Sequence, residues 1–339
     1  MSHAKLKRSF TLSLVFLALV RVSTAQTVET VGSRALGMGG AFVAVASDSS
    51  ATWWNPAGLA AGPFLDAALA RAVTESAGDL PAGRARATWF ALATPPFGVS
   101  YYRLKITDVQ PLTPTVTESG SREDRRAEMP VRSVAASQFG ITLVQTLVPG
   151  LHAGTTLKYV RATVRGSGAG GNSRAGDLLD RGDDLDGGDA GGAFDLDLGV
   201  LAVAGPVKVG LLVRNVREVE FEQEAGTARL PRQVRIGAAY DGALAGGPPL
   251  VVAVDADVRT TAGPTGDRRN VAAGVERWLA DRRVGIRGGA RFDTTGANER
   301  AATGGVSVAV RSGLFLDAHV VRGGAEDERG WGVAARVSF

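Results

Sequence analysis

The chain has 339 residues, enough for one large domain or two ordinary ones. Its 45 glycines and scarcity of helix-length apolar stripes argue against a helical protein, and the absence of cysteine excludes a disulfide framework. The formal charge of +4 comes from basic residues within the first 25, and the rest of the chain is neutral, so no nucleic-acid-binding surface is expected.

The first 25 residues have the order of a secretory signal. A basic start, from Lys5 to Arg8, precedes a short apolar run, and Ser23 and Ala25 are the small residues that a signal peptidase requires. The alternative is an uncleaved membrane anchor, but the run is about half of the roughly 20 residues that a spanning helix needs. We expect residues 1–25 to be a cleaved signal peptide of a protein exported to the cell outer membrane.

The next segment is rich in glycine and small residues. Its stretch GSRALGMGGAF is similar to a dinucleotide-binding loop, but no strand precedes it and Phe42 stands where the third glycine belongs. Gly37, Gly39 and Gly40 instead permit a close approach of this backbone to a neighbouring surface.

Two adjacent tryptophans then stand directly before Asn-Pro-Ala-Gly. Asn55 can cap a short helical turn, with Pro56 at its first position and Gly58 at its end. Burial of one aromatic side chain removes about 150–250 Å² from water. We therefore expect Trp53 and Trp54 to pack against an interior surface.

From residue 64 onward, apolar and polar residues alternate in successive segments. In 330–339, Trp331, Val333 and Val337 lie on one face and Arg336 on the other. A period of two over about ten residues is typical of a membrane-crossing strand, whereas a soluble sandwich shows it in strands of about 5–6 residues. The predicted strands are 64–73, 84–94, 97–107, 132–147, 150–166, 192–204, 206–219, 231–241, 249–260, 269–279, 282–293, 300–311, 313–322 and 330–339.

The links between these fourteen segments are alternately short and long. Outer-membrane barrels have this pattern, with short periplasmic turns and longer outer loops. Tyr240, Trp278 and Phe339 fall near predicted periplasmic ends and Trp331 near an outer end, where aromatic girdles lie. We predict an all-β fold, a 14-stranded antiparallel transmembrane β-barrel over 64–339, because closure leaves no unpaired strand edge in lipid.

The acidic link 176–192 has two interpretations. Asp184, Asp186 and Asp189 could supply oxygen ligands to calcium, although the spacing departs from that of an EF-hand. The alternative is a solvated outer loop, and we predict no metal site. The Arg-Gly-Asp tripeptide at 181–183 matches an adhesion motif that chance readily supplies.

No catalytic motif is found. The sequence has no Walker motif and no Gly-x-Ser-x-Gly, and it indicates no cofactor. His319 and Asp317 share a strand face and could mimic an acid–base pair, but no nucleophile stands beside them, so a hydrogen-bonded pair is favoured.

If the apolar strand faces meet lipid, the opposite faces bring charged side chains into the lumen. The mixed signs favour a network of ion pairs over a selectivity ring of one sign. Such a lumen is either filled and stabilised or a polar permeation path. The predicted lumenal residues are Lys158, Asp195, Asp197, Arg214, Arg235, Asp255, Asp257, Arg259, Glu276, Arg287, Arg291, Asp293, Asp317, His319 and Arg336.

The stretch 32–62 resembles the N-terminus of FadL/PorV-type outer-membrane proteins. The resemblance rests on Met38-Gly39-Gly40-Ala41-Phe42, on Asp48, and on Asn55-Pro56-Ala57-Gly58. Beyond this stretch the likeness is one of architecture. It implies a barrel whose N-terminal segment, residues 26–63, folds inside as a hatch that either opens or is fixed. The hatch and ligand-path residues that it indicates are Gly39, Gly40, Trp53, Trp54, Asn55, Pro56 and Ala57.

The resemblance also implies two functions. In the FadL branch, hydrophobic or amphipathic small molecules, such as fatty acids and aromatic hydrocarbons, enter passively past the hatch. In the PorV branch, the barrel is a non-conducting accessory of protein secretion, with secreted proteins as partners. We expect passive uptake and no enzymatic activity; the alternatives are the accessory role and a purely structural barrel. Outer-membrane lipid is an expected partner, and nucleic acid is not.

Overall fold

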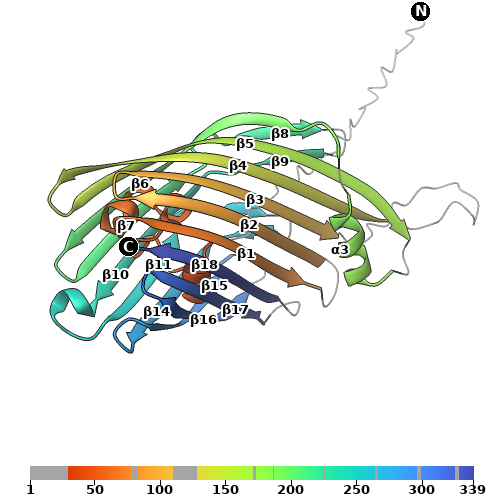
Figure 1. Ribbon diagram of the computed structural model, residues 1–339. Helices are drawn as coiled ribbons and strands as arrows, with labels where there is room; N and C mark the ends of the chain where they lie inside the picture. Colours follow the sequence, from red (N-terminus) through yellow and green to blue (C-terminus); the bar gives the residue numbers. More distant parts are fainter. Residues whose placement is uncertain are drawn as a thin grey trace, which may run out of the picture.

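The protein is a closed β-barrel in a computed structural model (Figure 1). The structure describes residues 30–77, 82–109, 128–170, 173–185, 187–223, 226–263, 266–295, 299–324 and 328–339. Fourteen antiparallel strands form the wall, in agreement with the prediction. The predicted signal peptide, residues 1–25, lies outside the described residues. Within them, no helix is both long and apolar enough to span a membrane.

The elements of the wall follow the chain from β1 to β18. The barrel strands are β1 (Asp66–Ser76), β2 (Ala82–Thr94), β3 (Phe97–Val109), β4 (Glu128–Val148), β5 (Leu151–Gly170), β6 (Gly191–Ala204), β7 (Val207–Arg214), β10 (Gln233–Asp241), β11 (Leu250–Asp257), β14 (Asn270–Leu279), β15 (Val284–Asp293), β16 (Arg300–Arg311), β17 (Leu314–Gly323) and β18 (Arg329–Ser338). The 3₁₀ helix η2 (Gly242–Ala245) lies in the link between β10 and β11.

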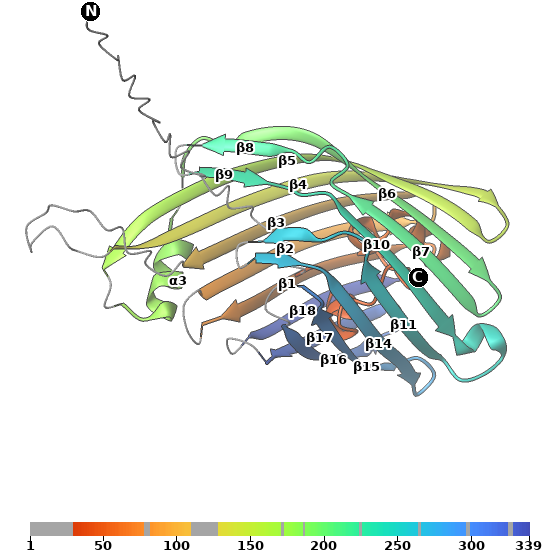
Figure 2. The same cartoon turned by 180° about the vertical axis from the view of Figure 1, so that it is seen from behind.

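Each barrel strand pairs with its neighbours in the chain, and β1 closes the wall on β18. Short turns join the strands at one end and longer links at the other, which are the periplasmic and outer ends of an outer-membrane barrel. The wall is uneven in height: β4 and β5 have 21 and 20 residues, whereas β7 and β11 have 8 each (Figures 1 and 2).

Two of the predicted loops contain short hairpins that the sequence did not reveal. β8 (Glu220–Gln223) pairs with β9 (Gly226–Arg229), and β12 (Thr261–Gly263) pairs with β13 (Gly266–Arg268). Strands this short give no clear alternation. The predicted strands 206–219 and 249–260 are therefore too long, since β7 ends at Arg214 and β11 ends at Asp257.

The outer face of the wall is apolar. Along β18, Trp331 and Val333 are about half exposed, whereas Gly332 and Ala334, which alternate with them, are buried. The same alternation repeats around the barrel, as expected of strands that face lipid on one side. Tyr240 and Phe339 are also exposed on this face, but the prediction for Trp278 was wrong: its ring is only 9% exposed and packs inside against Phe315.

The link between β5 and β6 is not the solvated loop that its composition suggested. Residues Ala175–Asp183 form helix α3, whose Leu178 and Leu179 pack on Val109 and Val131 (Figure 1). These two valines point outward from β3 and β4, because they have the same parity as the exposed Tyr101 and Phe139. Helix α3 therefore covers the outside of the wall near its outer end.

The adhesion-like tripeptide at 181–183 lies in this helix. The Asp183 carboxylate forms ion pairs with Arg84 and Arg86, both 2.8 Å, and accepts a hydrogen bond from Thr107. Because the carboxylate is bound by the wall, the tripeptide is not presented for adhesion. Of the proposed calcium ligands, Asp184 and Asp189 are exposed and Asp186 lies outside the described residues. No cluster of metal-binding side chains occurs in the described part of the chain.

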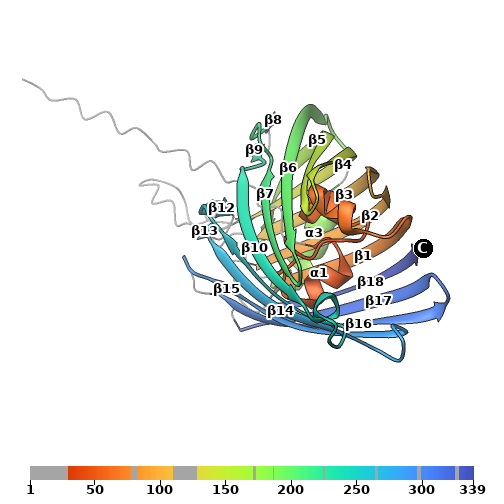
Figure 3. The same cartoon turned by 90° about the vertical axis from the view of Figure 1, so that its left-hand side faces the viewer.

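Residues 30–62 lie inside the barrel, toward its short-turn end (Figure 3). We call them the lumenal segment. It contains helices α1 (Ser33–Gly37) and α2 (Ala51–Trp54) and the 3₁₀ helix η1 (Pro56–Ala61). Between residues 30 and 59 every residue is buried except Arg34 and Ser47, which are half-buried. The lumenal segment, rather than the small wall residues alone, therefore forms the core of the protein.

Candidate functional site: the lumenal segment and its seat in the barrel

Short caps shape the second half of the lumenal segment. Asn55 is the N-cap of η1, where its side-chain oxygen accepts a hydrogen bond from Ala57 N at 3.2 Å, and Pro56 occupies the first position. The prediction that Gly58 ends this helix is wrong, because η1 continues to Ala61. A glycine is nevertheless required at position 58, since a Cβ there would lie 2.1 Å from Ala46 O.

Asn55 also ties the segment to the wall. Its amide nitrogen donates to Val43 O at 2.8 Å within the segment and to Val200 O at 3.0 Å on β6. A residue that caps a helix on one side and bonds the wall on the other leaves none of its polar atoms unpaired in the interior. The Asn-Pro-Ala sequence is thus explained by local folding and anchoring.

Inward-facing glycines of the wall seat the lumenal segment. A Cβ added at Gly289 would lie 2.2 Å from Met38 C, and one at Gly154 would lie 2.4 Å from Ala57 N. Conversely, a Cβ at Gly39, which has φ +72°, would lie 2.8 Å from Ala290 N and O. Wall and segment are thus in direct backbone contact. A Cβ on any of seven wall glycines would lie 3.1 Å or less from a backbone atom of the segment, and one at Gly98 would meet the Thr52 and Leu59 side chains at 2.9 and 3.0 Å. The seven glycines, from seven different strands, are Gly154, Gly199, Gly210, Gly237, Gly274, Gly289 and Gly305.

The two tryptophans are buried by different partners. The Trp54 Nε1 donates to Val31 O at 2.9 Å, and its ring meets Phe42 edge-on. The Trp53 ring centroid lies 4.9 Å from that of Tyr102 on β3. The guanidinium of Arg214, on β7, lies 4.4 Å from the centroid of the same Trp53 ring. Trp53 and Trp54 therefore hold the segment to the wall, and also to itself.

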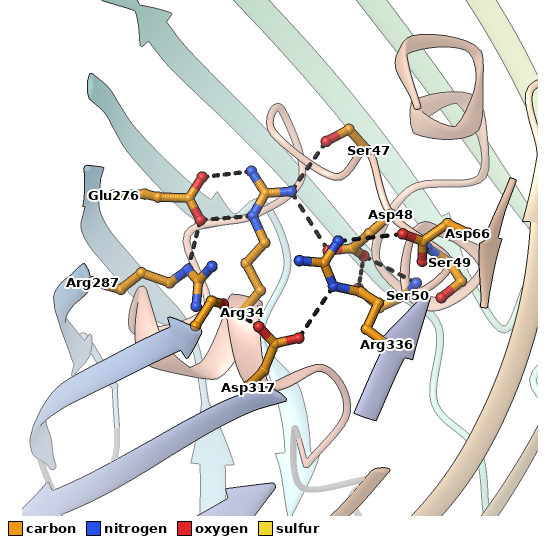
Figure 4. Close-up of polar contacts among 11 residues, drawn as sticks. Arg34, Ser47, Asp48, Ser49, Ser50, Asp66, Glu276, Arg287, Asp317 and Arg336 are labelled. Atoms are coloured by element: carbon orange, nitrogen blue, oxygen red, sulfur yellow. Dashed lines mark hydrogen bonds and ion pairs between the residues drawn. The ribbon is translucent and has the colours of Figure 1, made fainter. Parts of the chain in front are cut away.

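Arg34 is the centre of an ion-pair cluster (Figure 4). Its guanidinium binds the Glu276 carboxylate of β14 through two contacts of 2.7 Å and reaches Asp48 at 3.5 Å. Arg287 of β15 binds the same carboxylate at 2.6 Å. Burial alone would lower the pKa of Arg34, but the carboxylates of Glu276 and Asp48 outweigh it and raise this pKa above its ordinary value.

A second cluster joins the segment to the seam where the barrel closes (Figure 4). Arg336 on β18 binds Asp66 on β1 at 3.3 Å and Asp317 on β17 at 3.1 Å, and Asp66 accepts a hydrogen bond from Ser49 N at 2.8 Å. The expected hydrogen bond between Asp317 and His319 does not form. Asp317 bonds Ser307 and Arg336, and His319 Nδ1 has no partner among the described residues.

Asp255 holds the middle of the segment. This β11 carboxylate accepts hydrogen bonds from Phe42 N and Val43 N at 2.7 and 2.8 Å. A buried carboxylate that receives two backbone N–H groups makes strong, charge-assisted bonds. On β7, two strands away from β11, Arg214 donates to Trp53 O at 2.7 Å.

The remaining predicted lumenal charges pair mainly within the wall, and the Arg235 guanidinium also lies 5.8 Å from the Trp54 ring of the segment. Lys158 binds Asp197 at 2.6 Å and Asp195 at 3.7 Å, and Arg235 binds Asp257 at 2.7 Å. Arg291 pairs with Glu328, and the Asp293 carboxylate accepts hydrogen bonds from backbone N–H groups, including Arg269 N at 2.9 Å. Arg259 follows the end of β11 and is exposed, so it is not one of these buried ion pairs. The lumenal charges form several small groups rather than one continuous network.

A cavity of about 440 Å³ lies beside the lumenal segment at the short-turn end. Apolar side chains such as Val45, Val251 and Trp278 line part of it. Arg34, with its Glu276 partner, and the Lys208–Asp241 ion pair line the rest. The cavity thus offers both apolar and charged surface to a small molecule.

The family of the chain is shown by a sequence match along the barrel wall. The family described as "F plasmid transfer operon, TraF, protein" matches residues 70–257, which is more than half of the chain. The chain belongs to this TraF family. No curated protein matches its sequence.

Solved structures show that this TraF-family chain has the FadL-type barrel fold. The CymD monoaromatic hydrocarbon channel has a TM-score of 0.62 and 14% identity, over 93% of this chain and 99% of that one. The toluene transporter TbuX of Ralstonia pickettii has a TM-score of 0.60 and 15% identity, over 92% and 99%. A FadL homologue of Pseudomonas aeruginosa has a TM-score of 0.60 and 10% identity, over 92% and 99%.

Sequence reasoning missed much of what seats the segment in this TraF-family barrel. Arg34 was passed over because it is a single charge in a small-residue stretch, and Tyr102 because one tyrosine in a strand is unremarkable. The wall glycines did carry a signal, since a glycine inside a strand indicates that another backbone approaches closely.

Proposed function

We propose that this outer-membrane barrel admits small hydrophobic or amphipathic molecules passively, without energy input and without bond chemistry. The observation that carries the proposal is the architecture, a 14-stranded barrel with its N-terminal segment inside. That fold is shared along more than nine-tenths of the chain with proteins described as a monoaromatic hydrocarbon channel and a toluene transporter.

The solute path that we propose runs beside the lumenal segment, not through the place that it occupies. Moving the whole segment would break the Glu276 and Asp255 contacts and the Asn55 bond to Val200 together. Each buried polar group left without a partner costs about 1–3 kcal/mol. A path along the existing 440 Å³ cavity leaves the Asp255 and Asn55 contacts in place, because neither residue lines it.

The predicted hatch residues then act as a fixed closure. Gly39 and Gly40, at φ +72° and +86°, let the segment turn against β15, and Trp53 through Ala57 close the side next to β3, β5 and β6. The cavity lies below this closure, where its lining runs along the short-turn ends of the strands from β5 to β14. Its mixed lining suits an amphipathic solute, with the apolar part against Trp278 and the polar part against Lys208 and Arg34.

The mature protein in this proposal begins after residue 25. The order of charge, apolar run and small residues supports cleavage there. Mass spectrometry of the protein purified from the outer membrane should give the mass of 26–339, whereas the mass of 1–339 would contradict cleavage.

Uptake by whole cells tests the proposed function. Cells that lack the protein, and the same cells with it restored, are given a labelled monoaromatic hydrocarbon, a labelled long-chain fatty acid and a labelled hydrophilic sugar. The proposal predicts faster initial uptake of at least one hydrophobic solute with the protein present and no change for the sugar. Equal rates for every hydrophobic solute would disprove it.

An accessory role in moving macromolecules across the envelope is the second candidate. The description of the family as part of a plasmid transfer operon favours it, as does a segment anchored on many strands. In that case an envelope or secreted protein should co-purify with the cross-linked barrel from native membranes, and uptake should be unchanged. Enhanced uptake without any such partner would exclude this role.

A further inference from the structure

The outer wall carries a row of arginines on alternate strands. In the pairing register, Arg71 on β1 lies opposite Thr88 on β2, and Thr88 lies opposite Arg103 on β3. The row continues through Ser137 on β4 to Arg161 on β5. The three arginines are exposed, and neighbouring strands lie about 4.8 Å apart, so the arginine Cα atoms are spaced by roughly 10 Å.

An apolar row lies immediately on the membrane side of the arginines. Leu69, Phe90, Tyr101, Phe139 and Tyr159 are paired in the same way, each two residues nearer the short-turn end than its counterpart in the arginine row. All five side chains are exposed. On each strand the outer face thus changes from apolar to polar at this point, which is where lipid headgroups meet a barrel.

A pocket of about 200 Å³ opens just beyond this boundary. It is lined by Arg103, Ser133, Thr163 and Arg165, with Leu185 and the glycines that follow α3 on one side. These strand residues point outward, because their neighbours Leu104, Val134 and Val164 are buried in the interior clusters. Among the residues that the structure describes, none that lines the pocket is acidic.

Ser133 indicates that the pocket takes a ligand. The residue is only 2% exposed, and its hydroxyl has no hydrogen-bond partner within the described residues. A buried hydroxyl without a partner is costly, so such groups normally find an acceptor. The pocket that it lines has two guanidinium groups and a second hydroxyl, all of them donors suited to phosphate oxygens.

The wall holds the rim of this pocket in place. Arg165 donates to Gly187 O at 2.6 Å, and Arg84 binds Asp183 at the end of α3. Lys105 donates to the carbonyl oxygen of Asp183. Asp183 and Gly187 are therefore held against the outer wall, and the pocket between this rim and the strands is preformed.

We propose that this pocket and the arginine row bind the phosphorylated headgroup of an outer-leaflet glycolipid. One phosphate enters beside Ser133, Thr163 and Arg165, and a second lies against Arg103 or Arg161. The acyl chains then continue along the exposed rings of Tyr101, Phe139 and Tyr159. The apolar row next to the arginine row favours a lipid over free phosphate, because free phosphate has no apolar part that could contact the apolar row.

Binding of lipid A by the purified full-length protein in detergent tests the proposal. The probes are diphosphorylated lipid A, the same glycolipid without its phosphates, and inorganic phosphate, measured by native mass spectrometry. We expect the phosphorylated lipid to bind about tenfold more tightly than the dephosphorylated one, as several charge-assisted hydrogen bonds would give. Equal binding of the two lipids would overturn the proposal, as would free phosphate displacing lipid A at similar concentrations.

Matched variants locate the site. Arg103→Gln with Arg165→Gln should remove the preference for the phosphorylated lipid, and Ser133→Ala should reduce it by about threefold without affecting the fold. Arg322→Gln removes an exposed arginine of β17 outside this site and should change nothing. Heat-dependent migration on a gel verifies that each variant forms a barrel. If the double variant keeps the preference, or Arg322→Gln loses it equally, the site is not the one proposed.

Discussion

Arg34 and Glu276 join the lumenal segment to the barrel wall through two hydrogen bonds of 2.7 Å each. Arg34 belongs to α1 and Glu276 to β14, 242 residues away along the chain. The Glu276 side chain is 1% exposed and is also bound by Arg287. Because two cations share one buried carboxylate, the segment and two wall strands form a single ionic unit.

Replacing Arg34 by Gln should lower the free energy of unfolding by about 3–5 kcal/mol, because it breaks a buried ion pair from one side. The pKa of Arg34 is raised in the folded state, so its contribution is complete below the ordinary arginine pKa and is lost only above the folded value. The loss on substitution should therefore be the same at pH 7 and pH 10. Urea unfolding in detergent measures it.

Arg311→Gln is the control for this substitution, since Arg311 is exposed at the end of β16. It should change the unfolding midpoint little. If Arg311→Gln lost as much stability as Arg34→Gln, the loss would be a general effect of removing an arginine and not a property of the Arg34 ion pair. An unchanged midpoint for Arg34→Gln would contradict the ionic anchor.

Gly289→Ala should displace the lumenal segment, because the new Cβ would lie 2.2 Å from Met38 C. We expect a cost of about 1–3 kcal/mol from overpacking, together with raised conductance in a planar bilayer. Gly288→Ala is a matched control on the same strand, as a Cβ there meets nothing within 4 Å. Equal conductance of the two variants would show that the glycine seat does not close the lumen.

Trp53→Ala should open the β3 side of the closure, because it removes the contact with Tyr102 and the support of Arg214. Truncation of a buried tryptophan costs about 3–5 kcal/mol. Trp54→Ala should also raise leakage, since Trp54 is fully buried against Phe42. Trp331→Ala, on the lipid-facing side, should leave leakage of a small hydrophilic dye unchanged. If the folded Trp53→Ala variant leaked no more than the wild type, Trp53 would not contribute to the closure.

The barrel could be predicted from sequence because each strand repeats one simple rule. Lipid on one side and lumen on the other force a period of two, as in Trp331 and Val333 against Gly332 and Ala334. The strand count and the alternation of short and long links followed from it. Where a strand is too short to show a period, as in β8 and β9, the prediction failed.

The seat of the lumenal segment could not be predicted in the same way. The Arg34–Glu276 pair depends on how the chain folds back into the barrel, which no local pattern records. Trp278 was predicted to face lipid because aromatic residues are common at membrane interfaces, but its parity on β14 places it inside with Phe315. Parity is the stronger signal of the two, since it is fixed by strand geometry.

Uptake by cells with an obstructed cavity tests the central claim most directly. Ala61 lines the cavity and is itself exposed, so Ala61→Trp should fill this space with little effect on folding, and Ala61→Ser is the matched control. At equal amounts of folded barrel in the outer membrane, we predict that Ala61→Trp lowers the initial uptake of the labelled hydrophobic solute to that of cells without the protein, while Ala61→Ser keeps the wild-type rate. Wild-type uptake by Ala61→Trp would contradict passage beside the lumenal segment.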